Sequence, residues 1–428
     1  MKLEAPSNSN YAAVCIDLPP LKSLEGSDFL VGAPLLGFQA VISKDHRPTE
    51  RGVVFPAESQ LSEQMCRENN LFRHQDKNKD PDAKGYLEDT RRVRAIKLRG
   101  HRSDCLWLPL ESLAWTGANV SELRPGDCFD TLNGQEICRK YVIRTRESRG
   151  RQAKKEKRFE RVDPRLFPEH EDTANWFREK DRISPEQWVH VTQKIHGTSV
   201  RLGRTLVLRK LPLRDRIASK FGVKVQTQEW DAVAGSRKVI KDPNNPEQNH
   251  FYGDDIWTQH LDRVEHLIPE GFLVFGEIIG WTREGAPIQS GYTYCLPDHT
   301  SELYVYRVAM INPRGVLVDL SWPQVREWCA ERELKHVPDL WEGRHSEFIA
   351  EDWIDRRFAD EGYDALPLGP DKKLVDEGVC VRADGLVPVI LKVKSPQFNL
   401  HETSLLDQGE VDIESRETEG DDLASTAV

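Results

Sequence analysis

The sequence contains no stretch typical of a membrane helix, of a secretory signal or of a zinc-binding cysteine motif. Its 428 residues contain no apolar run near the ~20 residues that a membrane helix needs. Its first 14 residues show no basic segment followed by an apolar one, so we expect no secretory signal. Its eight cysteines form no Cys-x-x-Cys pair, and no His or Cys pair accompanies Cys128 and Cys138. We therefore expect a cytoplasmic protein with no membrane partner and no zinc ribbon.

The net charge of −10 is distributed unevenly along the chain. From His401 to Val428 there are nine acidic residues and one basic residue, so the first 400 residues carry a net charge of only −2. From Glu136 to Arg161 there are eleven basic and four acidic residues. Such a basic run attracts phosphates, although most charge runs are solvated surfaces. Charge alone therefore leaves a nucleic-acid partner and an ordinary solvated loop equally open.

Length and composition predict a globular protein with two domains, because domains usually have about 100–200 residues. We expect an N-terminal domain, a second domain and an acidic tail, at 1–165, 166–400 and 401–428. The boundary is the proline-containing stretch 162–168, and Asp172 and Thr173 offer an N-cap for a helix through Trp176 and Phe177. The tail has few large apolar residues, so we expect it to be disordered.

The N-terminal domain is rich in short apolar stretches that end at Gly, Pro or Asp. These stretches predict strands at 37–42, 52–56, 92–99 and 105–110. Short strands with this punctuation indicate a small β-barrel, and an OB-like barrel suits a nucleic-acid partner. We expect an α+β protein in which this barrel precedes a domain of antiparallel sheets with flanking helices.

The second domain contains a series of segments whose polar residues can serve one reaction. In chain order the segments are 193–199, 235–237, 275–280, 303–308, 377–382 and 391–394. Each has an ordinary interpretation when taken alone. Tyr304 and Tyr306 lie two apart and would share the core face of a strand, and Lys392 and Lys394 would protect an edge strand from aggregation.

Together these segments suit covalent nucleotidyl transfer. A lysine amine is a nucleophile only when it is neutral, so its reference pKa of about 10.4 must fall, and nearby cations lower it. A divalent metal ion and the Lys392/Lys394 pair would supply the cations, and the two lysines would also neutralise a triphosphate. Glu277 and Glu377 would hold the metal or its waters, because hard cations prefer oxygen ligands. An aromatic side chain would stack on the purine.

The series resembles motifs I, III, IIIa, IV and V of the covalent nucleotidyltransferase superfamily of ligases and mRNA capping enzymes. In this resemblance the nucleophile is Lys194, motif III contains Glu277, the base-stacking aromatic is Tyr306, motif IV contains Glu377, and motif V contains Lys392 and Lys394. The resemblance implies nucleotide-binding roles for Gln193, Gly197, Arg237, Glu277 and Tyr306. It implies metal-binding roles for Glu277 and Glu377. Gly197 would let the backbone turn tightly after the nucleophile strand.

Two positions of the resemblance carry alternatives. His196 stands where DNA ligases and many relatives have Asp, and this form resembles nick-sealing RNA ligases and the kinetoplastid RNA-editing ligases. We keep His196 in the catalytic set, although an imidazole cannot copy the contact of a carboxylate with metal-bound water. Ser236-Arg237 resembles a segment that contacts ribose or phosphate, and Ser219-Lys220 is the alternative.

Domain order favours RNA ligases within the superfamily. DNA ligases and capping enzymes place an OB domain after motif V, whereas the 34 residues after Lys394 are acidic and poor in apolar residues. The additional domain is N-terminal instead, as in the Deinococcus-type RNA ligases, and 92–110 is similar to a segment of their OB module. The nucleic-acid-binding residues would come from the basic clusters of this domain. They are Arg94, Lys97, Arg99, Arg151, Lys154 and Lys155.

The resemblance implies an ATP-dependent RNA ligase that uses Mg²⁺ or Mn²⁺ and acts in RNA repair. Lys194 would form lysyl-AMP, AMP would pass to a 5′-phosphate end, and a 3′-hydroxyl would attack that end. The partner would be RNA, in a nicked duplex or an RNA/DNA hybrid. The alternatives are a GTP-dependent capping-type guanylyltransferase, a DNA ligase, and a nucleic-acid-binding protein with an inactive transferase domain.

The same resemblance separates the two halves of the reaction. Every residue assigned to lysine adenylylation lies from Gln193 onward, whereas the basic clusters precede it. We therefore expect the N-terminal domain to act as a substrate clamp, so that a fragment starting near Asp172 still forms lysyl-AMP but seals nicks poorly.

Overall fold

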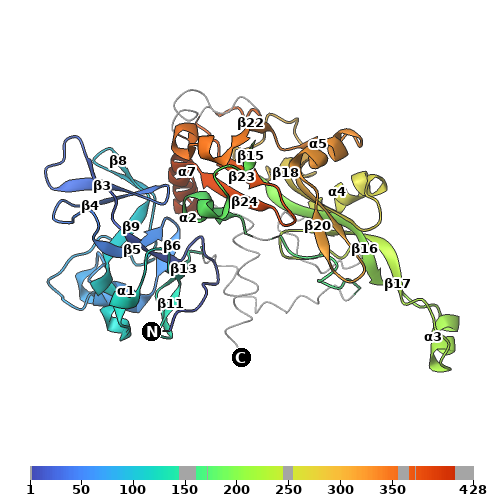
Figure 1. Cartoon of the computed structure of the whole chain (residues 1–428), viewed down its shortest axis with the longest axis horizontal. Coiled ribbons are helices and arrows are strands. Elements are labelled where there is room, and N and C mark those ends of the chain that lie inside the picture. The colour runs from blue at the N-terminus through green and yellow to red at the C-terminus, as the bar shows by residue number, and fades with distance from the viewer. Residues whose placement is uncertain are drawn as a thin grey trace.

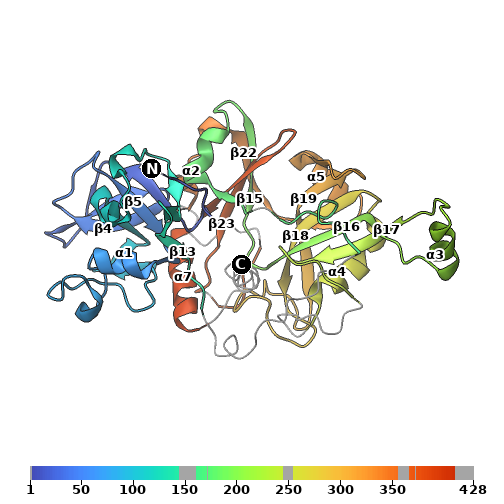
Figure 2. The same cartoon turned by 90° about the horizontal axis from the view of Figure 1, so that it is seen from below.

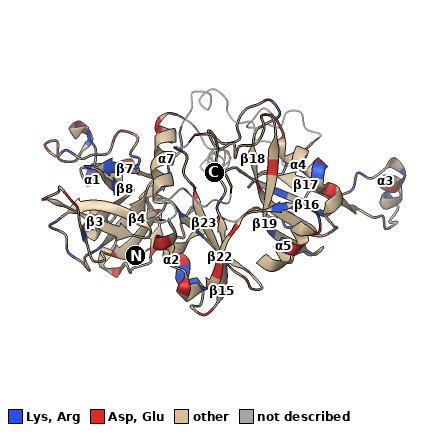
Figure 3. Ribbon diagram, turned by 90° about the horizontal axis from the view of Figure 1, so that it is seen from above, with Lys and Arg blue, Asp and Glu red and all other residues tan. Residues whose placement is uncertain are grey.

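The computed structural model describes residues 2–143, 161–170, 172–243, 254–354, 366–371 and 373–409. These residues form an α+β protein whose sheets are mainly antiparallel. The N-terminal part and the second part lie side by side, and helix α7 lies between them (Figure 1). Acidic and basic residues are interspersed over both parts (Figure 3). No helix in the described ranges is long and apolar enough to cross a membrane.

A four-stranded antiparallel sheet is the centre of the N-terminal part. Its strands, in the order β10-β1-β5-β9, are Cys128–Phe129, Ala13–Asp17, Arg51–Pro56 and Cys105–Pro109. The central strand β5 separates two hydrophobic cores, since Val53 and Phe55 pack in one core and Val54 in the other. This alternation follows from the period of two along a strand. The predicted strands at 52–56 and 105–110 are therefore confirmed within one residue.

Smaller elements surround this sheet. A second sheet contains β2 (Lys22–Ser23), β3 (Leu30–Leu35) and β4 (Phe38–Ser43), which confirms the predicted strand at 37–42. Three strand pairs are β6 (Ser59–Leu61) with β13 (Cys138–Lys140), β7 (Ile96–Leu98) with β8 (His101–Ser103), and β11 (Thr131–Leu132) with β12 (Gln135–Glu136). The helical turns are α1 (Glu63–Glu68), η1 (Gln75–Lys77), η2 (Leu110–Thr116) and η3 (Val120–Glu122).

Two predictions for the N-terminal part need correction. No sheet among the described residues closes into a barrel. The strand predicted at 92–99 is reduced to β7, because Arg92 forms only an isolated bridge with Gln60, while its side chain makes a buried ion pair with Glu58 (Nε–Oε2 distance 2.6 Å). The basic run 144–160, with Arg151, Lys154 and Lys155, lies outside the described residues.

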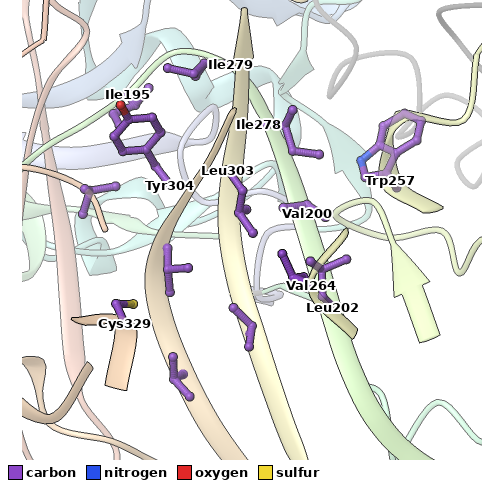
Figure 4. Close-up of a cluster of buried hydrophobic side chains, with 14 of the residues drawn as sticks. Ile195, Val200, Leu202, Trp257, Val264, Ile278, Ile279, Leu303, Tyr304 and Cys329 are labelled. Atoms are coloured by element: carbon purple, nitrogen blue, oxygen red, sulfur yellow. The ribbon is translucent and has the colours of Figure 1, made fainter. Parts of the chain in front are cut away.

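The second part contains two sheets. The larger has the order β17-β16-β18-β19-β20, and β21 pairs with β19. These strands are Gln228–Gly235, Thr198–Leu208, Phe272–Gly280, Ser301–Ile311, Leu317–Asp319 and Lys335–His336. Helices α4 (Ile256–Val264) and α5 (Trp322–Ala330) and the turn η6 (Glu265–Leu267) accompany this sheet. Trp257, Val200 and Ile278 belong to the apolar core of this region (Figure 4).

The smaller sheet carries two of the six polar segments singled out in the sequence, 377–382 and 391–394, and the first residue of a third, Gln193. Its order is β14-β24-β23-β15-β22, and its strands are Ala174–Asn175, Val389–Lys394, Gly378–Ala383, Trp188–Gln193 and Asp339–Arg344. Three helical elements flank it: α2 (Trp176–Glu179), η5 (Lys180–Arg182) and η7 (His345–Glu347). The predicted helix through Trp176 and Phe177 is present, but its N-cap is Asn175, not Asp172 or Thr173.

Two further helices remain: α3 projects from one end of the molecule, and α7 lies between its two parts. Helix α3 (Leu213–Lys220) projects at the tip of the β16–β17 hairpin (Figures 1 and 2). Helix α7 (Pro396–Asp407) runs seven residues into the stretch that the sequence assigned to the tail. Its side chains pack against both parts of the protein, which explains why these residues are ordered despite their acidic composition. Residues 410–428 lie outside the described residues.

Candidate active site

One cavity of about 1690 Å³ lies between the two parts of the protein. All ten residues that the sequence assigned to catalysis and nucleotide binding line it. They are Gln193, Lys194, His196, Gly197, Arg237, Glu277, Tyr306, Glu377, Lys392 and Lys394. Segments separated by up to 200 residues in the chain therefore meet at one place.

Lys194 is held where strand β15 ends. Its backbone N–H donates to the carbonyl of Gly378 on the neighbouring strand β23 at 2.9 Å. The next residue, Ile195, is buried in the apolar core (Figure 4), which fixes the backbone on the other side of the lysine. The preceding Gln193 donates its side-chain N–H to Asp376 at 2.7 Å. The nucleophile candidate thus stands on a rigid backbone with only its side chain free to reach the cavity.

Lys194 and Glu377 form the central ion pair of the site. Their Nζ and Oε1 atoms are 2.7 Å apart, and the Glu377 side chain is 9% exposed. Burial opposes the charge of Lys194, but Glu377, Cys380 and Glu277 together outweigh burial and raise the pKa of the lysine. Burial likewise opposes the charge of Glu377, but Lys194 and His196 hold the pKa of this carboxyl far below its ordinary value. In the nucleotide-free site the lysine is therefore protonated.

The two lysines of strand β24 have opposite electrostatic environments. Burial, together with the charges of Lys194 and Lys394, lowers the pKa of Lys392 to about 7. Burial also disfavours the charge of Lys394, but an ion pair with Glu402 of helix α7 raises its pKa. The site thus keeps Lys394 charged by a carboxylate that the sequence did not single out.

Gly197 and Glu277 fit together across strands β16 and β18. Oε1 of Glu277 accepts a hydrogen bond from the backbone N–H of Gly197 at 3.0 Å, and Oε2 accepts one from the Ser199 hydroxyl at 3.4 Å. A Cβ atom at position 197 would lie 2.3 Å from the carbonyl oxygen of Ile278. Glycine is therefore required here by the close approach of β18, not by the turn that the sequence predicted.

His196 lies in an aromatic setting. Its ring packs edge-on against Tyr292 and Phe398, with centroid distances of 4.9 and 5.0 Å. Its backbone N–H donates to the hydroxyl of Tyr294 at 2.7 Å. Its Nδ1 is 3.7 Å from Oε2 of Glu377, too far for a good hydrogen bond. The imidazole is positioned by packing, a feature that an aspartate at this position would not share.

Sequence reasoning missed several residues of this site. They are Gln289, Tyr292, Tyr294, Phe398 and Glu402. Gln289 donates to the carbonyl of Gly197 at 2.7 Å, so it supports the same backbone segment as Glu277. The cluster of polar and aromatic residues at 289–294 was a signal, but only the fold brings it to His196.

The two tyrosines of strand β19 do not share a role. The register between β18 and β19 shifts at Phe275 and Gly276, which pair with Arg307 and Val305, so the shift falls at Tyr306. Tyr304 is 7% exposed and packs in the core (Figure 4), whereas Tyr306 lines the cavity. Tyr306 also packs against the core that contains Tyr304, but the bulge at this position interrupts the regular alternation of the strand.

Of the two segments proposed to contact ribose or phosphate, Ser236-Arg237 and Ser219-Lys220, the structure favours the first. Arg237 lines the cavity, where it forms an ion pair with Asp172. The alternative pair, Ser219 and Lys220, lies in or beside the C-terminal turn of α3, at the projecting tip (Figure 2). The structure thus brings Ser236-Arg237 to the site and leaves the alternative outside it.

Residues 187–394 match the RNA ligase family model. The matched segment begins just before β15 and ends with Lys394, so it covers the strands that carry all ten candidate residues. This match supports the interpretation of the chain as an enzyme of the RNA ligase type. No curated protein matches the chain.

The fold is similar to that of solved RNA ligases from Naegleria gruberi. One such structure, with PPi, has a TM-score of 0.58 and 16% sequence identity, and the match covers 92% of this chain and 98% of that one. A variant with ATP and Mn has a TM-score of 0.56 and 17% identity, with the same coverage. A variant with AMP and Mn has a TM-score of 0.58 and 16% identity, over 90% and 97% of the two chains. The similarity extends over the N-terminal part as well as the RNA ligase segment.

The N-terminal part contributes basic and acidic side chains to the same cavity, with Asp89, Asp130 and Glu136 on the lining beside the basic residues. Strand β13 supplies Arg139 and Lys140, and Arg91 lies nearby on the lining. The ammonium group of Lys140 lies 5.2 Å from the ring centroid of Tyr11, another lining residue. Arg94, Lys97 and Arg99, which the sequence assigned to nucleic-acid binding, lie away from this cavity in the described part of the chain.

The carboxylates of the site have the chemistry that a divalent cation requires. Buried Oε2 of Glu377 accepts no hydrogen bond from any described residue, so this oxygen is available to a further ligand. Glu277 offers a second carboxylate on the same cavity. No group of three or more His, Cys, Asp or Glu side chains that would hold a metal alone is found among the described residues. Oxygens of a bound nucleotide would therefore complete the coordination of Mg²⁺ or Mn²⁺.

Proposed function

We propose that the protein is an ATP-dependent RNA ligase that joins a 5′-phosphate to a 3′-hydroxyl, with Lys194 as its nucleophile. The observation that carries the proposal is the contact of 2.7 Å between Lys194 and Glu377 in a cavity that Glu277, Lys392 and Lys394 also line. A partly buried lysine amine beside carboxylates and two further cations is suited to attack a nucleotide phosphate.

The reaction would proceed in three steps. The neutral amine of Lys194 attacks the α-phosphorus of ATP, a P–N bond forms, and pyrophosphate leaves. The 5′-phosphate of a strand then attacks this phosphoramidate, so that AMP passes to the strand end and the lysine is released. A 3′-hydroxyl finally attacks the activated phosphate, a phosphodiester bond forms, and AMP leaves.

The residues around Lys194 would divide the work of the first step. Lys392 and Lys394 would bind the phosphates and stabilise the charge that develops during transfer. Tyr306 would stack on the purine, and Arg237 would contact the ribose or a phosphate. A divalent cation held by Glu277 and Glu377 would supply Lewis-acid stabilisation of the phosphates when bound.

The N-terminal part would hold the nucleic acid. Its support is that Arg139 and Lys140 of strand β13 line the same cavity as Lys194, where they can contact phosphates. We propose domain limits at 1–165 and 166–400, an OB-like arrangement of the first, and a Deinococcus-type organisation of the whole. Repair of nicked RNA, in a duplex or an RNA/DNA hybrid, is the process that such an enzyme would serve.

Covalent labelling tests the first step and its nucleotide. The full chain is incubated with α-labelled ATP or GTP and Mg²⁺ or Mn²⁺, then denatured. We expect acid-labile, alkali-stable label from ATP. Label from GTP alone would instead indicate a capping-type enzyme, and no label from either would indicate a binding protein with an inactive transferase domain.

Nick sealing tests the substrate. Two nicked duplexes are compared that differ only in the sugar at the 3′-hydroxyl end, ribose or deoxyribose. We expect sealing of the ribose end to be faster by a large factor. Equal sealing of both ends would favour a DNA ligase.

A further inference from the structure

Helix α7 has two faces that carry polar side chains, one of them together with Phe398, and each face contacts a different part of the protein. Phe398 and Glu402 lie four residues apart, and so do Asn399, Thr403 and Asp407. Residues four apart lie on the same side of a helix. The helix lies between the N-terminal part and the transferase sheets in both views (Figures 1 and 2).

The first face touches the candidate active site. Glu402 forms an ion pair with Lys394, and both residues line the cavity. Phe398 is 1% exposed and packs against the His196 ring at a centroid distance of 5.0 Å. The ammonium group of Lys394 also lies 5.2 Å from the Phe398 ring centroid. This face therefore contacts two of the five residues assigned to catalysis.

The second face is bonded to the N-terminal part through buried groups. The hydroxyl of Thr403 donates to Glu58 at 2.6 Å and accepts from the backbone N–H of Ala95 at 3.1 Å. Asn399 donates to Asp104 at 3.2 Å. The side chains of Thr403 and Asn399 are only 3% and 4% exposed. Hydrogen bonds of this kind are sensitive to small displacements, because a buried donor or acceptor left without its partner is strongly disfavoured.

A buried ion pair fixes the contact surface of the N-terminal part. Arg92 binds Glu58 with distances of 2.6 and 2.8 Å and also reaches Asp407 at 2.8 Å. Arg92 and Glu58 are each 5% exposed. The hydroxyl of Thr403 therefore contacts a carboxylate whose position is already set by an arginine.

We propose that α7 is the link through which the N-terminal part sets the geometry of the adenylylation site, with Glu402 as the positioning residue for Lys394. The proposal rests on the proposed function, because Lys394 matters only if the site transfers a nucleotide. It replaces the simple separation expected from the sequence, in which the N-terminal part acts only as a clamp for nucleic acid.

The link has a direct consequence for the rate of lysyl-AMP formation. Without Glu402, the Lys394 side chain is free to adopt other rotamers, and fewer molecules present its charge to the phosphates. A charge-assisted hydrogen bond contributes about 1.5–3 kcal/mol, which corresponds to roughly a 10-fold to 100-fold change in rate. Lys392 would still bind the phosphates, whereas the charge of Lys394 would be missing where charge develops during transfer. The loss should therefore appear mainly in the maximal rate and less in the ATP concentration at half-saturation.

The test compares full-length variants in single-turnover labelling with ATP and Mg²⁺. Glu402→Gln is expected to lower the maximal rate at least about 10-fold with less than about 3-fold change in half-saturation. Thr403→Val, which removes the bonds to Glu58 and Ala95, should lower the maximal rate in the same way, whereas Thr403→Ser keeps the hydroxyl and should restore it. The matched control is Ser404→Ala, an exposed position of the same helix.

Each outcome decides one part of the proposal. A wild-type rate in Glu402→Gln overturns the positioning role of Glu402, and a wild-type rate in Thr403→Val overturns the link to the N-terminal part. If thermal unfolding shows that Thr403→Val is not folded, Asp407→Asn replaces it, because Asp407 is partly exposed and its ion pairs within the described ranges are with Arg92 and Arg94. Failure of the proposed function looks different, since the wild-type protein itself would then carry no label.

Discussion

At the residue scale, the resting site is arranged around a charged nucleophile. The contact of 2.7 Å between Lys194 and Glu377 favours the ammonium form, which cannot attack a phosphate. Activation therefore requires that Glu377 turn to another cation when the nucleotide binds. A divalent metal ion brought by the triphosphate would serve this purpose, because it competes for the carboxylate and its own charge disfavours the ammonium form.

Replacement of Lys194 should abolish covalent labelling without unfolding the protein. Lys194→Ala removes the nucleophile, and Lys194→Arg should fail as well because a guanidinium does not lose its proton at working pH. Lys210→Ala, at an exposed position, is the control and should label at the wild-type rate. Retention of the acid-labile AMP adduct in Lys194→Ala would exclude this residue as the nucleophile.

The carboxylates should control the metal dependence of the same reaction. Glu277→Ala and Glu377→Ala each remove an oxygen ligand from the cavity, and we expect the labelling rate to fall by more than about 100-fold at low Mg²⁺. Titration with Mg²⁺ and Mn²⁺ measures the effect, and a partial recovery at high metal concentration is expected. Near wild-type rates at low Mg²⁺ in both variants would place the metal elsewhere.

Lys392 should give the folded protein a distinctive pH dependence. Its pKa falls from 10.5 to about 7 in the folded state, so between these values the unfolded chain binds more protons than the folded one. The contribution of Lys392 to the free energy of unfolding must therefore rise with pH above about 7. Urea unfolding at pH 7, 8 and 9 should show wild type gaining stability relative to Lys392→Met. If the difference in free energy of unfolding between wild type and Lys392→Met stays constant over this pH range, the pKa of Lys392 is not lowered in the folded state.

At the element scale, local patterns located most strands but not how the strands meet. The segments around Glu277 and Lys392 have sequence patterns typical of strands, and the structure has strands β18 and β24 there. The bulge that separates Tyr304 from Tyr306 was not predictable, because a register shift depends on the partner strand. The contacts of His196 with Tyr292 and Phe398 were equally hidden, since they join segments about 100 and 200 residues away.

Gly197→Ala tests the element-scale explanation of the site. A Cβ there would lie 2.3 Å from the carbonyl of Ile278, so strands β16 and β18 would have to separate next to Glu277. We expect a loss of more than about 2 kcal/mol in the free energy of unfolding and a strong fall in labelling. Gly385→Ala is the control, because its Cβ would meet only Val387 at an ordinary 3.5 Å. Equal stability of the two variants would contradict the close-approach explanation.

At the scale of the whole molecule, the sequence predicted the order of the two parts but not their connection. The acidic composition after residue 400 favoured a disordered tail, yet α7 uses Glu402 and Asp407 as ion-pair partners for Lys394 and Arg92. Composition cannot reveal this, because a carboxylate is costly to bury only when it has no partner. The cavity between the parts is a consequence of the same connection, since its walls come from both.

The two walls of the cavity predict a different salt dependence for adenylylation and for sealing. Sealing requires a polynucleotide whose phosphates displace counterions, so its rate at subsaturating RNA should fall steeply between 50 and 200 mM salt, as expected for roughly 6–10 phosphate contacts. Lysyl-AMP formation involves only the nucleotide and should fall less. Arg139→Ala with Lys140→Ala removes two positive charges from the cavity lining and should reduce the salt slope by about 2. Lys97→Ala with Arg99→Ala removes the same charge from the hairpin β7–β8, away from the cavity, and should leave the slope unchanged. If the hairpin pair reduces the slope and the β13 pair does not, the nucleic acid follows the opposite face of the N-terminal part.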